Sequence, residues 1–314
     1  MIFYFAPLEG VTDATFRRIH HACFGGVSKY FIPFVSPTQN LVFTSRDLAA
    51  IAPENNVGVP AVPQLLAKDA SLFLWAAQAL GDMGYSEVNL NLGCPSGTVT
   101  AKGKGSGLLT DIPALERLLD GIFAKSPLPV SIKTRIGYAH VEEFSRLIDV
   151  FAQYPIHELI IHPRTRTEFY KGTPHRDAYA QACAALSMPL CCNGDLFTQA
   201  DCAELTAQFP STHALMLGRG LIANPALCSG APLTKDALIR FHDALFAAYQ
   251  EKYPPHVALG RMREIAKHFV CCFEAPEKPR KAIRKAAKME AYLEAMRRLF
   301  EEHELTEDPK FTPL

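Results

Sequence analysis

The stretch Glu158-Leu159-Ile160-Ile161-His162-Pro163-Arg164-Thr165-Arg166 joins a short apolar run to a polar and positively charged end. A continuous apolar run of this length, bounded by a turn signal, is typical of a parallel strand that is covered on both faces. An amphipathic helix is predicted just before it, at 141–153. The pattern therefore indicates one βα unit whose polar residues lie at the carboxyl end of its strand.

The same pattern recurs along the chain as far as residue 223. Strands are predicted at 3–8, 30–35, 61–66, 87–92, 130–135, 158–162, 189–193 and 214–217, and further helices at 69–83, 113–124 and 198–208. Eight βα units that close on themselves predict an α/β protein with a (β/α)8 TIM barrel. An open doubly wound sheet is the alternative, but the first strand-to-helix turn lacks the GxGxxG signature of a dinucleotide fold.

The alternation of strands and helices stops after Ala223. The segment 231–302 has a helical pattern throughout, and a break containing glycine and proline precedes it at 229–232. Because a single barrel takes roughly 250 residues, a chain of 314 residues has room for one barrel and an appendage. We expect a catalytic barrel domain at 1–230 and a small all-helical domain at 231–314.

The overall composition limits the class of protein. The formal net charge is zero, so any surface for nucleic acid must be local. No run approaches the roughly 18 apolar residues of a membrane helix, and the first residues lack the basic region of a signal peptide. The nine cysteines show no CxxC spacing, and their odd number argues against a disulfide framework. We expect a cytoplasmic monomer without membrane association and without a metal site.

Most of the predicted strands end in polar residues or glycines. In a barrel these ends meet on one face, which is where barrel enzymes carry their chemistry. The ends together therefore predict a single large polar site. The segments concerned are 6–13, 64, 89–95, 133–137, 162–166, 193–195 and 218–220.

The last two strand ends, Asn193-Gly194-Asp195 and Gly218-Arg219-Gly220, suggest a phosphate site. Barrels commonly bind phosphate with the loops after strands seven and eight, and an arginine there offers two parallel hydrogen bonds. The alternative is that these glycines only serve tight turns. Lys133 and His162 lie in or directly after apolar runs and are expected to face the same ligand, with a structural ion pair or a rim contact as the alternative.

Cys94 follows a glycine and precedes a proline at a strand end, so its thiol is expected at the barrel mouth. An ordinary thiol has a pKa of about 8.5, is mostly protonated at neutral pH, and can donate a proton to a developing carbanion. The following segment is rich in glycine and basic, with Lys102 and Lys104 as candidate contacts to an anionic ligand. A Walker-type phosphate loop is excluded because the GK[ST] sequence is absent.

A basic stripe is predicted near the C-terminus. Arg280, Arg284 and Lys288 recur every four residues and would share one face of a helix. Such a stripe can follow the phosphates of a nucleic acid. A merely solvated helix face is the alternative.

In their order, these motifs resemble those of the tRNA-dihydrouridine synthase family. They extend from residue 6 to residue 220, and the predicted helical C-terminal region also fits this family. The motifs that carry the resemblance are Ala6-Pro7-Leu8-Glu9-Gly10-Val11-Thr12-Asp13, Asn91-Leu92-Gly93-Cys94-Pro95, Lys133-Thr134-Arg135-Ile136-Gly137, His162-Pro163-Arg164-Thr165-Arg166, Asn193-Gly194-Asp195 and Gly218-Arg219-Gly220.

The resemblance implies a barrel that holds FMN and uses NADPH, or alternatively NADH, to saturate the C5–C6 bond of uridine in tRNA. It implies that Cys94 is the catalytic proton donor and that Asn91 contacts the target uracil. The flavin would be contacted by Pro7, Leu8, Glu9, Gln64, Lys133 and His162, and its phosphate end by Asn193, Gly194, Asp195, Gly218 and Arg219. The further candidate RNA contacts are Arg164, Arg166, Lys102, Lys104, Arg280, Arg284 and Lys288.

Two other functions stay open at this point. An FMN barrel that acts on a free metabolite, similar to a dihydroorotate dehydrogenase or an ene-reductase, would have no need of the basic tail. An RNA-binding protein without chemistry would leave the cysteine and the polar strand ends without a purpose. A yellow purified protein with flavin absorbance would exclude the second of these.

Overall fold

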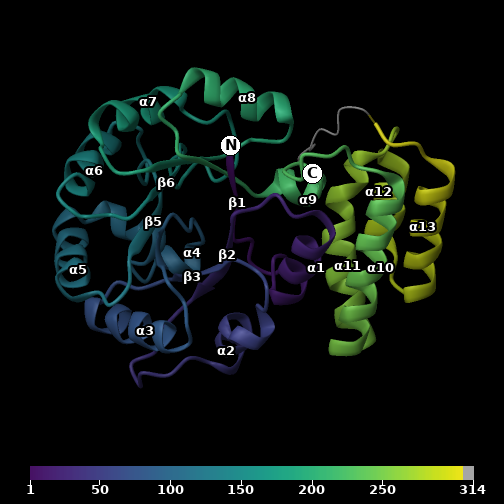
Figure 1. Ribbon diagram of the computed structural model, residues 1–314, viewed down its shortest axis with the longest axis horizontal. Coiled ribbons are helices and arrows are strands. Elements are labelled where there is room, and N and C mark those ends of the chain that lie inside the picture. The colour runs from purple at the N-terminus through teal and green to yellow at the C-terminus, as the bar shows by residue number, and fades with distance from the viewer. Residues whose placement is uncertain (307–314) are drawn as a thin grey trace.

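The computed structural model describes residues 1–306 and contains a closed barrel of eight parallel strands, with helices around it and a group of further helices at one side (Figure 1). The strands pair in sequence order, and the barrel closes where Tyr4 of the first lies opposite Met216 of the last. The predicted TIM barrel is therefore confirmed. The strands are β1 (Ile2–Phe5), β2 (Lys29–Val35), β3 (Ala61–Leu65), β4 (Val88–Leu92), β5 (Val130–Arg135), β6 (Leu159–His162), β7 (Leu190–Asn193) and β8 (Ala214–Leu217).

Several helices of the barrel begin at residues whose side chains cap them. Asp111 accepts a hydrogen bond from the backbone N–H of Ala114, and Thr198 does the same for Asp201, which fits the sequence signals for helix starts. The helices are α1 (Ala14–Phe24), α2 (Ser45–Ile51), α3 (Ala70–Asp82), α4 (Gly97–Thr100), α5 (Ile112–Lys125), α6 (Glu143–Phe151), α7 (Arg176–Ala185), α8 (Gln199–Gln208) and α9 (Arg219–Ala223), with 3-10 turns η1 (Pro53–Asn55) and η2 (Gly105–Thr110).

The side chains of each strand alternate between two cores. The outer faces pack against the helices in one large apolar cluster. The inner faces contribute a second, small cluster that includes Tyr4, Phe31, Ile160 and Met216. Because successive strand residues point to opposite faces, the polar residues that share the inner positions must also face the barrel axis. This alternation turns the polar strand ends into one site.

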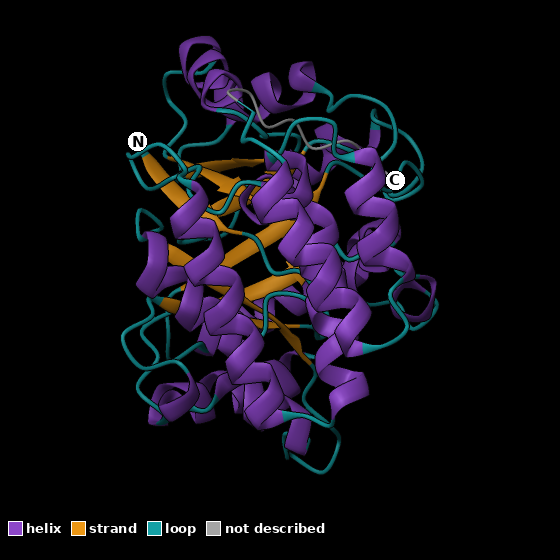
Figure 2. Cartoon of the chain, turned by 90° about the vertical axis from the view of Figure 1, so that its right-hand side faces the viewer, coloured by secondary structure: helices purple, strands orange, loops and turns teal. Residues whose placement is uncertain are grey.

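The C-terminal helices pack against α1 on one side of the barrel (Figures 1 and 2). Phe241 meets Phe16 and Phe24 edge-on, with ring centroids 5.7 and 5.2 Å apart. Asp13, which caps α1, also accepts hydrogen bonds from Tyr249 and Arg261, at 3.0 and 2.8 Å. The helices are α10 (Lys235–Lys252), α11 (Pro255–Phe269), η3 (Val270–Cys272), α12 (Glu277–Lys285) and α13 (Met289–Glu302).

The helical character predicted for 231–302 is confirmed, while the domain boundary at residue 230 stays a prediction. The last part of the predicted second domain, 307–314, lies outside the described residues. Among residues 1–306, no helix is both long enough and apolar enough to cross a bilayer. All nine cysteines lie in this part of the chain, and each is a free thiol.

Candidate active site

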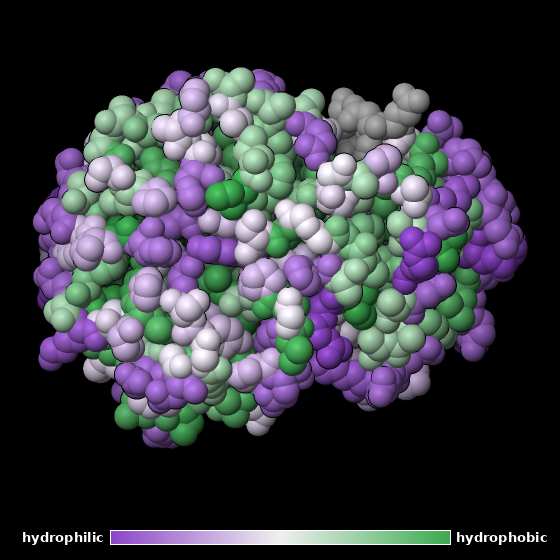
Figure 3. Space-filling model, viewed as in Figure 1, coloured by the Kyte–Doolittle hydropathy of each residue, from purple (hydrophilic) through white to green (hydrophobic). Residues whose placement is uncertain are grey.

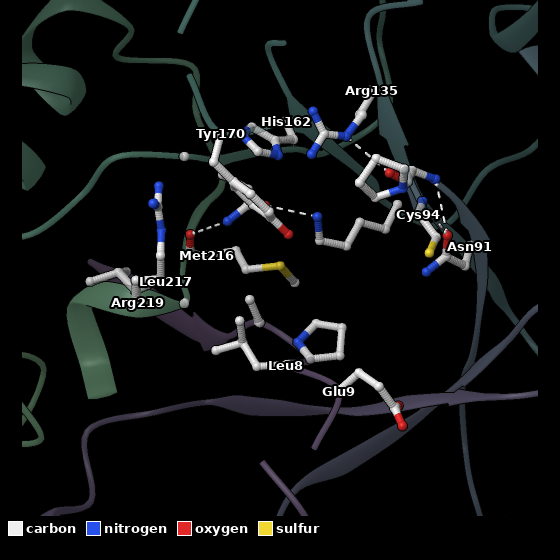
Figure 4. A pocket seen from close by; sticks show the side chains of 18 of the residues that line it. Leu8, Glu9, Asn91, Cys94, Arg135, His162, Tyr170, Met216, Leu217 and Arg219 are labelled. Atoms are coloured by element: carbon white, nitrogen blue, oxygen red, sulfur yellow. Dashed lines mark hydrogen bonds between the residues drawn. The ribbon is translucent and has the colours of Figure 1, made fainter. Parts of the chain in front are cut away.

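A cavity of about 310 Å³ opens at the carboxyl ends of the strands, and all eight strands or the residues directly after them contribute to its wall (Figure 4). The structure brings together every residue that the sequence assigned to the flavin, the phosphate end, the uracil and the proton donor. These residues are Pro7, Leu8, Glu9, Gln64, Asn91, Cys94, Lys133, His162, Asn193, Gly194, Asp195, Gly218 and Arg219.

Lys133 and His162 face the cavity from β5 and β6. The ammonium group of Lys133 donates to Oδ1 of Asn193 at 2.8 Å, and within residues 1–306 it forms no ion pair with a carboxylate. Burial, assisted by the nearby charge of Arg135, lowers the pKa of Lys133 to about 7. Burial and the same charges, of Arg135 and Lys133, hold the pKa of His162 well below its usual range, so its imidazole is neutral. The wall therefore offers hydrogen-bond donors to a ligand that is anionic or that carries carbonyl groups.

Arg219 and Asp195 line the end of the cavity beside β7 and β8, and the buried Arg164 holds the aspartate from behind. Arg219 donates to Asp195 at 2.8 Å, and Arg164 donates to both oxygens of the same carboxylate. Asp195 has a left-handed backbone with φ of 49°, and Gly194, with φ of 130°, brings the chain so close to His162 that a Cβ there would lie 2.9 Å from its ring. The loops after β7 and β8 thus bring their glycine backbones close to the cavity, beside the guanidinium group of Arg219.

Cys94 lies on the opposite wall, held through its backbone. Its N–H donates to Oδ1 of Asn91 at 2.9 Å, and its carbonyl accepts from the Ser106 hydroxyl at 2.7 Å. The thiol is half-buried, and burial raises its pKa, only partly opposed by Arg135 and other neighbours. It therefore stays protonated at neutral pH. Figure 4 shows the Cys94 sulfur and the Asn91 amide side by side at the cavity wall.

Comparison with known families identifies this arrangement. The family model described as "Dihydrouridine synthase (Dus)" matches residues 4–307. The chain belongs to the dihydrouridine synthase family. The match begins within β1 and extends beyond α13, so it covers both the barrel and the C-terminal helices.

Curated relatives within the family support the assignment. The chain is 30% identical over 227 residues to tRNA-dihydrouridine synthase B of Pasteurella multocida, and the alignment covers 71% of this chain and 67% of the relative. It is also 30% identical over 250 residues to a probable tRNA-dihydrouridine synthase of Rhodobacter capsulatus, covering 79% and 73%. These similarities extend well beyond any single motif.

Solved structures share the barrel at much lower sequence identity. The old yellow enzyme homologue of Zymomonas mobilis has a TM-score of 0.55 at 13% identity and covers 76% of this chain and 91% of its own. Morphinone reductase has a TM-score of 0.52 at 13% identity and covers 76% and 88%. At this identity the similarity concerns the fold alone.

The structure contradicts the prediction that Arg164 contacts RNA. Its side chain is fully buried, because the guanidinium group lies between the Asp195 carboxylate and the backbone carbonyls of Lys171 and Gly172. Arg164 is therefore part of the wall that supports the phosphate-end loops. Its partner is far away in sequence, so the local pattern could not reveal this role.

The predicted basic stripe is also corrected. The helix α12 ends at Lys285 because Ala286 adopts an extended backbone, with φ of −61° and ψ of 106°, and Lys288 instead precedes α13. Arg280 is half-buried and donates to the Cys271 sulfur at 3.1 Å. Of the three predicted residues, Arg284 alone is exposed on α12 itself, although the exposed Lys288 lies just beyond it.

The remaining RNA candidates lie near the mouth or on the surface. Arg166 donates to the carbonyl of Pro95, directly after the cysteine, and its guanidinium group lies 5.1 Å from the exposed Phe169 ring. Lys102 is exposed, and Lys104 is half-buried with its pKa lowered by burial and by Lys102. Their contact with RNA stays a prediction.

Three residues that shape the cavity have no individual role predicted from the sequence. Arg135 donates to the carbonyls of Gly93 and Thr165 and lies under the Tyr170 ring, 5.5 Å from its centre. Tyr170 also faces Arg219, at 4.9 Å, and Met216 fills the floor between them (Figure 4). Strand alternation from Lys133 could have found Arg135, whereas Tyr170 reaches the site from a loop. Among the described residues, no group of acidic, cysteine or histidine side chains could hold a metal ion.

Proposed function

We propose that the protein is a tRNA-dihydrouridine synthase that reduces the C5–C6 bond of uridine in tRNA with FMN and NADPH. Family membership and the names of the relatives support this substrate. The fit of the site to FMN rests on its donors: a half-buried lysine without a carboxylate partner in residues 1–306, a neutral histidine, and glycine-containing loops beside Arg219. A tRNA substrate also implies a cytoplasmic protein, and we propose that it acts as a monomer.

When bound, FMN supplies the hydride that is added to C6 of the uracil. The chain's own task is to position the base and to provide a proton at C5. Asn91 and Cys94 lie on one wall, so a uracil held by the Asn91 amide would have the thiol within its reach. Because burial keeps the thiol protonated, Cys94 is suited to donate that proton without a further base.

The observation that carries the proposal is the place of Cys94. Of the nine cysteines, all within the described residues, it is the one that lines the cavity. Most of the others are buried among apolar side chains, where a cysteine serves as a small hydrophobic residue. A structural cysteine would not need the two backbone anchors that hold Cys94 at the cavity wall.

The test combines a spectrum with a product assay. The purified protein should be yellow, and dihydrouridine should disappear from specific positions of tRNA in cells that lack it. Cys94→Ala should keep bound FMN but lose most uridine reduction, and Cys94→Ser should fall between the two. A yellow protein whose absence leaves every tRNA unchanged would instead support reduction of a free metabolite, and full activity of Cys94→Ala would refute the proton-donor role.

A further inference from the structure

A line of hydrogen-bonded side chains runs through the barrel interior, away from the cavity wall. Asn91 donates to Gln64 at 2.7 Å, Gln64 to Asn89 at 2.8 Å, Asn89 to Ser131 at 2.9 Å, and Ser131 to the Glu87 carboxylate at 2.6 Å. All five side chains are buried. They meet because each takes an inner position on or beside β3, β4 and β5.

Both ends of this line have a fixed polarity. At the cavity, Oδ1 of Asn91 accepts from the backbone N–H groups of Gly93 and Cys94, which can only donate. At the other end, Glu87 also accepts from the ammonium group of Lys29 at 2.7 Å. Every link between them must therefore point the same way, with the donor on the cavity side.

The direction of these hydrogen bonds determines which atom of the Asn91 amide faces the cavity. Since Oδ1 of Asn91 is used by two backbone groups, its amide nitrogen is the atom left to face the cavity, as Figure 4 shows. Gln64 likewise keeps its oxygen toward Asn91 and its nitrogen toward Asn89. An amide can turn round at little cost in isolation, but here each turn would place two donors against each other.

We propose that Glu87 is a positioning residue. As the terminal acceptor of this line, it holds the side-chain amides of Gln64 and Asn91 in one orientation, in which they would contact the cofactor and the base. This inference rests on the proposed function, because Gln64 and Asn91 are the proposed contacts to FMN and uracil. Glu87 itself lies at the opposite end of β4 from the cavity and touches neither.

The substitution Glu87→Gln tests the polarity without changing the size of the side chain. Lys29 can only donate, so it should take the amide oxygen of the new glutamine and leave the amide nitrogen facing Ser131. The line then holds one donor too many. Two donors must then face each other at one of the links. If this link is near the cavity, the Gln64 amide has rotated or Asn91 has moved away from the Cys94 backbone.

Glu158→Gln is the matched control. Glu158 is also buried and also pairs with Lys29, at 3.2 Å, but its other oxygen accepts from the Tyr4 hydroxyl and has no link to the amide line. Both substitutions remove one buried negative charge beside the same lysine. They differ in which hydroxyl loses its carboxylate acceptor: Ser131 of the amide line in Glu87→Gln, and Tyr4 outside that line in Glu158→Gln.

The experiment measures release of FMN from the holoenzyme by its fluorescence. Glu87→Gln should weaken FMN binding about tenfold, as expected for a stranded buried donor, while Glu158→Gln should stay within about twofold of the wild type. In a Ser131→Ala background, Glu87→Gln should have no further effect, because the hydroxyl that connects them is gone.

Three results would overturn the proposal: wild-type FMN affinity in Glu87→Gln, an equal loss in Glu158→Gln, or a full Glu87→Gln effect without the Ser131 hydroxyl. A wild-type protein that binds no FMN would overturn the proposed function, and this inference with it. The two failures are thus distinguishable.

Discussion

Lys133 and Asn193 join β5 to β7 across the barrel, with 2.8 Å between the ammonium nitrogen and the amide oxygen. Asn193 is oriented in turn by donating to the carbonyl of Met216, at 2.8 Å. The oxygen thus has to face the lysine. A neutral amide accepts a hydrogen bond but supplies no negative charge to compensate the ammonium group. Because the lysine lacks this compensation, burial lowers its pKa to about 7.

This depressed pKa predicts a pH-dependent stability. Above pH 7 the folded apo-protein carries a neutral Lys133, whereas an unfolded lysine stays protonated until about pH 10.4. The unfolded state then binds more protons, so stability rises with pH over this range. The free energy of unfolding of the wild type, measured relative to that of Lys133→Met, should rise by up to about 1.4 kcal/mol per pH unit between pH 7 and pH 9. Urea unfolding across that range measures it, and a constant difference would contradict the shifted pKa.

The barrel and most of the site could be predicted because they depend on local patterns. The ranges predicted for β5 and β8 agree with the structure residue by residue, since continuous apolar runs between turn signals mark buried parallel strands. The barrel geometry then places the polar ends together without further information. That is why the cavity contains all the predicted flavin residues, even though their roles stay proposals.

The rest depends on contacts between distant parts of the chain. Arg164 looked like a surface residue of a basic loop, but Asp195 and two carbonyls enclose it. The stripe at 280–288 assumed one helix, but the chain turns at Ala286. Neither the partner of a buried arginine nor the end of a helix without glycine or proline has a clear local signal. Both are decided by packing.

Gly105 is predicted to be needed beside Cys94, the proposed proton donor. Its φ of +56° disfavours other residues, and a Cβ there would lie 3.0 Å from the Cβ and the carbonyl oxygen of Cys94. Gly105→Ala should therefore cost about 1–2 kcal/mol of stability and, by displacing the thiol, lower turnover about tenfold. Gly97→Ala is the control, since nothing lies within 4 Å of its Cβ position. Similar urea midpoints and turnover in both variants would argue against this strain.

Arg164 should contribute to stability rather than to RNA binding. Removing a buried arginine leaves its carboxylate partner less compensated, so Arg164→Ala should cost about 3 kcal/mol. Arg46→Ala, which removes an exposed partner of the exposed Glu9, should cost less than about 1 kcal/mol. Urea unfolding compares the two variants. Equal losses, or a lower salt dependence of tRNA binding in folded Arg164→Ala, would restore a surface role for this residue.

The exposed basic residues of α12 provide the test of RNA binding. Arg284 and Lys285 are exposed in the last turn of this helix, and hydrophilic residues gather over this side of the molecule (Figure 3). If each contacts one phosphate, the slope of log K against log salt should fall by about one for each residue replaced by glutamine.

Arg297 on α13 gives the matched control for this experiment. It is exposed as well, but its guanidinium group already pairs with Glu294, at 2.9 Å, and with Glu301. Breaking these pairs to reach a phosphate would offset the gain, so Arg297→Gln should leave the slope for tRNA unchanged. If Arg284→Gln and Lys285→Gln also leave the slope unchanged, α12 is only a solvated face, and the RNA must be held by the mouth residues around Arg166 and Lys102.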